Sequence, residues 1–160
     1  MRKTLHGTKI ALLVANGFNQ QDYTAIQKTM NSAGASLKLV SPDQGLVNGW
    51  EGSGWGHHFP VDQQLGTALG ADFDILVVPG GQRSMDKLKT TAHTKRFVNS
   101  FMVSAKKVVL FSDAVALLEF AGQGADASVH DNVLVIDDLE NVSAILDFFV
   151  VTEEDIQQAA

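Results

Sequence analysis

The chain contains no cysteine among its 160 residues. This absence excludes disulfides, thiolate metal sites and a cysteine nucleophile. Basic residues are also few, since 12 Lys and Arg stand against 18 Asp and Glu and the formal net charge is −6. A chain of this charge does not favour the phosphate backbone, so we expect no nucleic-acid partner.

Long apolar runs are absent as well. No stretch approaches the roughly 18 apolar residues of a membrane helix, and the N-terminal MRKTLHGTK lacks the apolar region of a signal peptide. We therefore expect a soluble, cytoplasmic protein with no membrane partner. The length and an apolar content of 45% suit one globular domain over residues 1–160.

What is present is an alternation of strand and helix patterns. Continuous apolar runs, typical of strands buried on both faces, occupy residues 10–15, 37–40, 74–79, 108–111 and 133–136. Apolar residues recur at helical spacing over residues 23–33, 97–102, 114–120 and 142–149. Asp62 is expected to cap a short helix through residue 69, and the glycine-rich residues 45–60 fit a hairpin or an irregular excursion. This order predicts an α/β fold with a doubly wound, mostly parallel central sheet and helices on both faces.

Sheets of this kind bind ligands at the carboxyl ends of their strands. Three such ends are readable here, at residues 16–22, 79–82 and 112–113. Any active site is expected among these segments.

The segments KIALLVANGFNQQDYT, DILVVPGGQRSMDKL and KVVLFSDAVALLEFAG resemble, in order and spacing, the ThiJ/PfpI superfamily of class I glutamine amidotransferase-like folds. The resemblance covers about residues 9–122. It implies a flavodoxin-like three-layer sandwich and a Cys on a strained strand-to-helix turn, the nucleophile elbow. It also implies a carboxylate from the first motif that contacts this Cys, and a Pro-Gly-Gly segment that supplies backbone amides.

Carried over by position, the elbow Cys of the family falls on Ser112, its His on Asp113 and its Gly on Ala114. A register in which Asp113 occupies the crest of the elbow stays open. A serine hydroxyl needs a base within hydrogen-bond reach, and no His stands beside Ser112. The resemblance therefore disfavours peptidase, glyoxalase and deglycase activity, which the family owes to its Cys.

The first-motif carboxylate falls on Asp22, an upstream acidic position falls on Asn19, and Gly80 and Gly81 match the amide-donating loop. Asp22 and Asp113 would be two carboxylates near one another, which raises one pKa and does not activate an alcohol.

The short tail after residue 122, together with the Cys-less elbow, is similar to the C-terminal domain of large-subunit catalases. Those domains lack the catalytic Cys and serve stability and assembly. The resemblance thus implies a stress-associated protein that forms a homodimer or a higher homo-oligomer, without a cofactor. Association with a separate catalase rests on this analogy alone.

Simpler interpretations stand beside these. Ser112 and Asp113 fit a helix N-cap, and Asp22 suits the first turn of a helix. Gly80 and Gly81 fit either a tight loop or an anion site.

Two features lie outside these motifs. His57 and His58 are neighbours that point to opposite faces of an extended segment, so we expect no metal site. Trp50 and Trp55 fit a cover over the site or a subunit contact.

Two functional hypotheses follow. The first is a non-catalytic, homo-oligomeric binding or stress-associated module with a pocket for a small molecule or an anion. This pocket is expected to be lined by Asp22, Gly80, Gly81, Ser112 and Asp113. The second is an atypical hydrolase or lyase in which Asp113, with its pKa raised by Asp22, acts as general acid or base. The second hypothesis requires the two carboxylates to converge.

Overall fold

The computed structural model describes residues 7–124, 126–137, 144, 145 and 148. Its central sheet has the strand order β6-β3-β1-β7-β8-β9, and every pairing within it is parallel. The strands are β1 (Lys9–Leu13), β3 (Ser36–Ser41), β6 (Gln63–Gln64), β7 (Ile75–Val78), β8 (Lys107–Phe111) and β9 (Val133–Ile136). The predicted parallel α/β sheet is confirmed.

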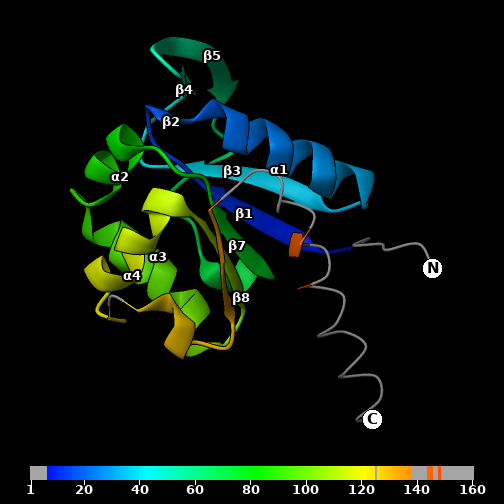
Figure 1. Cartoon of the computed structure of the whole chain (residues 1–160), viewed down its shortest axis with the longest axis vertical. Coiled ribbons are helices and arrows are strands. Elements are labelled where there is room, and N and C mark those ends of the chain that lie inside the picture. Colours follow the sequence, from blue (N-terminus) through cyan, green and yellow to red (C-terminus); the bar gives the residue numbers. More distant parts are fainter. Residues whose placement is uncertain (1–6, 125, 138–143, 146–147, 149–160) are drawn as a thin grey trace.

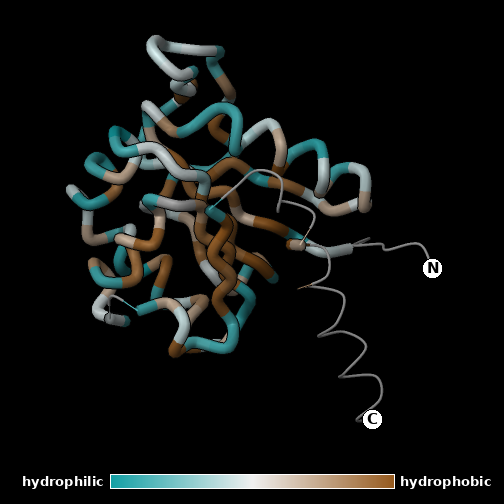
Figure 2. The backbone as a smooth tube through the Cα atoms, in the orientation of Figure 1, coloured by the Kyte–Doolittle hydropathy of each residue, from teal (hydrophilic) through white to brown (hydrophobic). Residues whose placement is uncertain are grey.

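Helices cover both faces of this sheet (Figure 1). Helix α1 (Gln20–Ser32) lies on one face, and α2 (Gln82–Leu88), α3 (Ala92–Val103) and α4 (Ala116–Phe120) lie on the other. Alternate residues of β1 enter two separate cores, with Ile10 and Leu12 on the α1 side and Ala11 and Leu13 on the α3 side. Figure 2 shows this apolar character along the central strands. Burial on both faces explains why the strands are continuous apolar runs.

The described ranges also contain three short 3₁₀ helices, η1 (Gly70–Asp72), η2 (Ser112–Val115) and η3 (Ala127–Val129). No helix in these ranges has both the length and the apolar character that crossing a lipid bilayer requires.

A second, smaller sheet stands at the carboxyl edge of the central one. It contains β2 (Phe18–Asn19), β4 (Leu46–Glu51) and β5 (Gly54–Pro60). Strand β2 pairs with β4 in parallel, and β4 and β5 form an antiparallel hairpin near the start of α1 (Figure 1). Of the two interpretations of residues 45–60, the hairpin is therefore the observed one.

The helix expected between Asp62 and residue 69 is wrong. This segment contains β6 and a turn, and η1 begins only at Gly70. The carboxylate of Asp62 is engaged elsewhere, because Oδ2 accepts a hydrogen bond of 2.7 Å from the Leu39 amide on β3. The Asp62 amide in turn donates to the Leu39 carbonyl at 2.9 Å, so the residue extends the sheet and caps no helix.

The pattern that predicted a closing helix falls mostly outside the described residues. Ile145 is described and fully buried in the core on the α1 side. Val142, Leu146 and Phe149 lie outside the described ranges.

The β4–β5 hairpin is attached to α1 through one buried amide side chain, that of Gln20, which is 5% exposed. Its Nε2 donates to Glu51 Oε1 at 2.7 Å and lies 2.8 Å from His57 Nδ1, while its Oε1 accepts from the His57 backbone amide at 2.7 Å. A Cβ atom at Gly49 would lie 2.7 Å from Gln20 Oε1, and one at Gly56 would overlap the same oxygen. Because Gly49 and Gly56 have no side chain, the hairpin has room for the side chain of Gln20.

Gln20→Ala is expected to lower the free energy of unfolding by about 1–2 kcal/mol, because the partly buried His57 amide loses its acceptor. The emission of Trp50 and Trp55 should shift as the hairpin loosens. Chemical denaturation followed by tryptophan fluorescence measures both effects. Gln27→Ala, an exposed position on the same helix, is the matched control and should stay within about 0.5 kcal/mol of the original chain.

Candidate functional site

The carboxyl ends of β1, β7 and β8 lie side by side because these strands are parallel neighbours. Gly80, after β7, lies between the other two segments. A Cβ atom on Gly80 would stand 3.1 Å from Asp22 Oδ2, 3.2 Å from the Phe111 carbonyl oxygen and 3.9 Å from the Asp113 amide nitrogen. The structure thus brings together Asp22, Gly80 and the β8–η2 corner, as the sequence predicted.

Asp22 lies in the first turn of α1 and is 7% exposed. It does not cap the helix. The cap is Asn19, whose Oδ1 accepts from the amides of Gln21 at 3.0 Å and Asp22 at 3.2 Å. The Asp22 carboxylate instead points across to β7, where Oδ2 accepts a 3.0 Å hydrogen bond from the Gly80 amide.

Burial raises the pKa of Asp22 above its ordinary value, because the charged form loses hydration. The hydrogen bond from Gly80 acts in the opposite direction and lowers this pKa, and the negative charge of Asp113 raises it further. Desolvation is the largest of these effects, so the net shift is upward. Asp22 and Asp113 therefore interact electrostatically.

The elbow corner is a 3₁₀ turn. Its N-cap position belongs to Phe111, with φ of −93° and no side-chain capping bond, so Asp113 lies within the turn and does not cap it. Asp113 is exposed, and the side chain of Ser112 lies outside what the structure describes. Across the described ranges the one non-glycine residue with positive φ is Ala105, so Asp113 lacks the strained backbone expected at the crest of an elbow.

The two carboxylates lie in different surroundings. Among the contacts described for Asp22 and Asp113, no hydrogen bond joins the two groups. Asp22 is buried against Gly80, whereas Asp113 faces solvent. The charge of Asp113 nevertheless acts on the buried carboxyl of Asp22 and raises its pKa.

Gly81 occupies a backbone conformation that favours glycine, with φ of +120°. A Cβ atom there would lie 2.7 Å from the Gly17 carbonyl oxygen and 2.8 Å from the Asn19 amide nitrogen. Asn19 N also donates to the Gly80 carbonyl at 2.8 Å. The Pro-Gly-Gly segment therefore brings the end of β7 into close backbone contact with Gly17 and β2, and the Gly80 amide already donates to an internal carboxylate.

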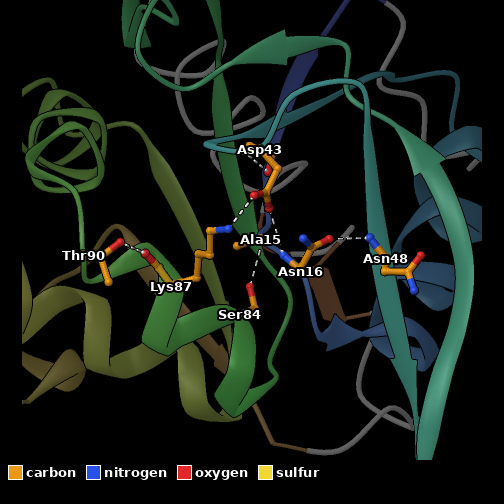
Figure 3. Close-up of polar contacts among 8 residues, drawn as sticks. Ala15, Asn16, Asp43, Asn48, Ser84, Lys87 and Thr90 are labelled. Carbon is orange, nitrogen blue, oxygen red and sulfur yellow. Dashed lines mark hydrogen bonds and ion pairs between the residues drawn. The ribbon is translucent and has the colours of Figure 1, made fainter.

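Helix α2 is held over this corner by polar contacts that the sequence did not reveal (Figure 3). Ser84 is fully buried and its Oγ accepts from the Ala15 amide at 3.0 Å. Lys87 Nζ lies 2.7 Å from Asp43 Oδ1, and Asp43 Oδ2 accepts from the Asn16 amide at 3.1 Å. Asp43 was visible only as part of a turn, because nothing local in the sequence signals a partner on α2.

The histidine pair does not form a metal site. The His57 ring approaches Gln20, and His58 lines a separate hollow beside Asn48. Within the described part of the chain, no group of three or more His, Asp or Glu side chains is placed to hold a metal ion.

The raised pKa of Asp22 gives a stability prediction with a definite sign. A carboxyl whose folded pKa lies above its unfolded value stabilises the fold most at low pH, and this contribution is lost as the pH rises through the folded pKa. Asp22→Asn removes the titration while keeping an oxygen acceptor for Gly80. The stability of the original chain relative to Asp22→Asn should therefore increase as the pH falls from neutral towards 4, as measured by urea unfolding at several pH values.

Asp72→Asn is the matched control, since Asp72 is exposed and lies before β7, at the other end of the sheet. A pH-independent difference between Asp22→Asn and the original chain would contradict the assigned shift.

Comparison with known proteins agrees with this geometry. General stress protein 18 of Bacillus subtilis (strain 168) is 30% identical over 153 residues, which cover 93% of this chain and 86% of that protein. Catalase HPII of Pseudomonas putida is 26% identical over 142 residues, which cover 89% of this chain and only 18% of the catalase. The chain therefore corresponds to a small part of the catalase.

Solved structures show the same fold. Oxidized DJ-1 of Toxoplasma gondii superposes with a TM-score of 0.74 at 15% identity, covering 96% of this chain and 94% of that one. Residues 8–159 match the sequence profile described as the DJ-1/PfpI family, the family to which the three quoted motifs pointed. The chain belongs to the DJ-1/PfpI family.

Proposed function

We propose that the chain is a non-catalytic DJ-1/PfpI-like protein that acts as a homo-oligomeric binding or stress-associated module. The observation that carries this proposal is the complete absence of cysteine from a chain that keeps the surrounding arrangement. Asp22 and Gly80 still face the β8–η2 corner, and Gly81 still closes the loop against Gly17 and β2.

The electrostatics of the corner support the loss of catalysis. A serine alcohol becomes a nucleophile only when a base removes its proton. The ionisable groups described at the corner are Asp22 and Asp113, and their negative charges already oppose one another. An alkoxide formed here would add a further negative charge beside two carboxylates, which is unfavourable.

The stress-associated role draws on the relatives. One of them is named a general stress protein, and another is a catalase in which the matching region is a small fraction of the whole. Since the chain matches so little of the catalase, haem chemistry is not part of the proposal.

The β4–β5 hairpin supports the homo-oligomer. Leu46 on β4 and Trp55 on β5 are 56% and 54% exposed and line the same hollow. Exposed aromatic and apolar side chains of this kind are typical of interface cores.

One specific observation keeps the atypical hydrolase or lyase as a second candidate. The charge of Asp113 raises the pKa of the buried Asp22, and a buried carboxyl whose pKa is perturbed by a specific charged neighbour is a common sign of an acid–base site. In that case the exposed Asp113 would contact the substrate, with the buried Asp22 as its charged neighbour.

Turnover of glyoxal, methylglyoxal and fluorogenic peptides distinguishes the two candidates. The original chain should show no rate above that of Asp22→Asn, Asp113→Asn or the Asp72→Asn control, because none of these removes a working nucleophile. A rate that Asp113→Asn abolishes and Asp72→Asn leaves intact would overturn the non-catalytic proposal and favour the hydrolase or lyase.

The oligomer is tested by light scattering coupled to size-exclusion chromatography. The original chain is expected to have at least twice the mass of 17.2 kDa, and Leu46→Glu should reduce it by placing a charge in the contact. Val103→Glu, on α3 at a position 83% exposed, should leave the mass unchanged. A monomeric original chain would refute the oligomer.

A further inference from the structure

A cavity of about 440 Å³ lies beside the candidate site, between the β4–β5 hairpin and the start of α2. Trp50 and Arg83 line it, together with Asn19, Gln21 and Gln82. This volume falls within the range of about 300–1,000 Å³ that is usual for small-molecule pockets. The candidate catalytic carboxylates, Asp22 and Asp113, are not among its lining residues.

The Arg83 guanidinium lies over the aromatic pair of the hairpin. Its Cζ atom is 4.4 Å from the centroid of the Trp50 ring and 5.7 Å from that of Trp55. Within the described ranges, no hydrogen bond or ion pair engages the guanidinium. A guanidinium has five N–H donors in a planar fork, so the contact with the rings leaves these donors available for a ligand.

The ring partner is held in place before any ligand arrives. Trp50 Nε1 donates to the Gly52 carbonyl at 2.8 Å, and the Trp50 and Trp55 rings meet edge to face at 5.2 Å. Gly17 leaves room for the arginine, because a Cβ atom there would overlap Arg83 Cβ. Groups already ordered in this way bind with a smaller entropic cost.

Helix α2 is ordered as well. The buried Ser84 accepts from the Ala15 amide, and Lys87 pairs with Asp43 (Figure 3). Arg83 directly precedes Ser84 in the helix, so the anchored Ser84 fixes the backbone of Arg83 near the segment that follows β1. Lys87 forms an ion pair with Asp43. Arg83 is the one cationic side chain among the described residues that line the cavity.

From this geometry we propose that the Arg83–Trp50 cavity binds a small molecule that carries a carboxylate on a polar body. A planar guanidinium fork matches a carboxylate through two parallel hydrogen bonds. A single cation in a chain of net charge −6 suits one negative charge better than the two of a phosphate monoester. The amide side chains of Asn19, Gln21 and Gln82 line the remainder of the cavity and suit hydroxyl or amide groups.

This binding site goes beyond the proposed function, since it requires neither a nucleophile nor its absence. It adds Arg83 and Trp50, which no catalytic expectation included. The aromatic pair that the sequence assigned to a cover or an interface thus also has a role in holding an arginine.

The test uses the two tryptophans as reporters, since they are the only two in the chain. The ¹⁵N-labelled protein is titrated with acetate, L-lactate and succinate while the indole N–H signals are followed, and lactamide serves as the uncharged counterpart of lactate. At least one carboxylate should shift the Trp50 signal saturably, and lactamide should not. Arg83→Met should weaken that binding at least about tenfold, because charge-assisted hydrogen bonds are lost.

Matched variants separate the fork from charge alone. Arg83→Lys keeps the charge without the fork and should bind several-fold more weakly than the original chain. Lys89→Met removes an exposed cation at the end of α2 and should bind normally. The readout is the indole shift, whereas the test of the proposed function depends on turnover, so the failure of one can be told from the failure of the other.

Three results would overturn the proposal. The first is a titration in which no carboxylate in the series shifts either indole signal saturably. The second is binding that survives Arg83→Met in a variant that melts like the original chain. The third is tighter binding of inorganic phosphate than of every carboxylate, which would mean that the site is built for a different anion.

Discussion

Gly80 makes two hydrogen bonds with the segment that follows β1, one as a donor and one as an acceptor. The arrangement at the carboxyl edge of the sheet depends on these two bonds. The Gly80 amide donates to the Asp22 carboxylate, and its carbonyl accepts from the Asn19 amide. A carboxylate that is 7% exposed is costly without a donor, so the bond from Gly80 makes the buried position of Asp22 tolerable. The next residue, Gly81, then passes so close to Gly17 and strand β2 that a side chain would collide with their backbone. The path of this loop places α2 and every side chain that α2 presents.

The same contact holds the framework of the site together without a cysteine. The Asp22–Gly80 bond joins the first turn of α1 to the end of β7, and it does so whether or not a thiol lies nearby. The absence of cysteine therefore leaves the framework intact, and the raised pKa of Asp22 follows from burial and from the charge of Asp113. The raised pKa of this carboxyl is thus a consequence of how the fold closes. Binding at Arg83 and Trp50 would use the rigidity of the same loop from its other side.

Much of this arrangement was predictable, and the failures share one cause. Apolar runs buried on both faces identified the parallel strands, and the order of the three motifs placed Asp22, Gly80 and the β8–η2 corner at one edge. Asp62 was predicted to cap a helix because its local sequence suits a cap, but its carboxylate accepts a hydrogen bond from the Leu39 amide on β3. Arg83 went unnoticed, since its aromatic partner belongs to a hairpin well before it in the chain. Propensity and spacing describe neighbours, whereas these contacts join distant segments.

The sequence by itself determined that no thiol chemistry occurs, that the chain is acidic, and that a parallel sheet forms, because composition and the period of apolar residues are local properties. Only the tertiary structure decided that Asn19 caps α1, that Asp22 faces Gly80 and that Asp113 remains in solvent. It likewise decided that Gln20 anchors the hairpin and that Arg83 lies on Trp50. Those pairings depend on the register of parallel strands and on the paths of the loops between them, which bring together residues that no local pattern relates.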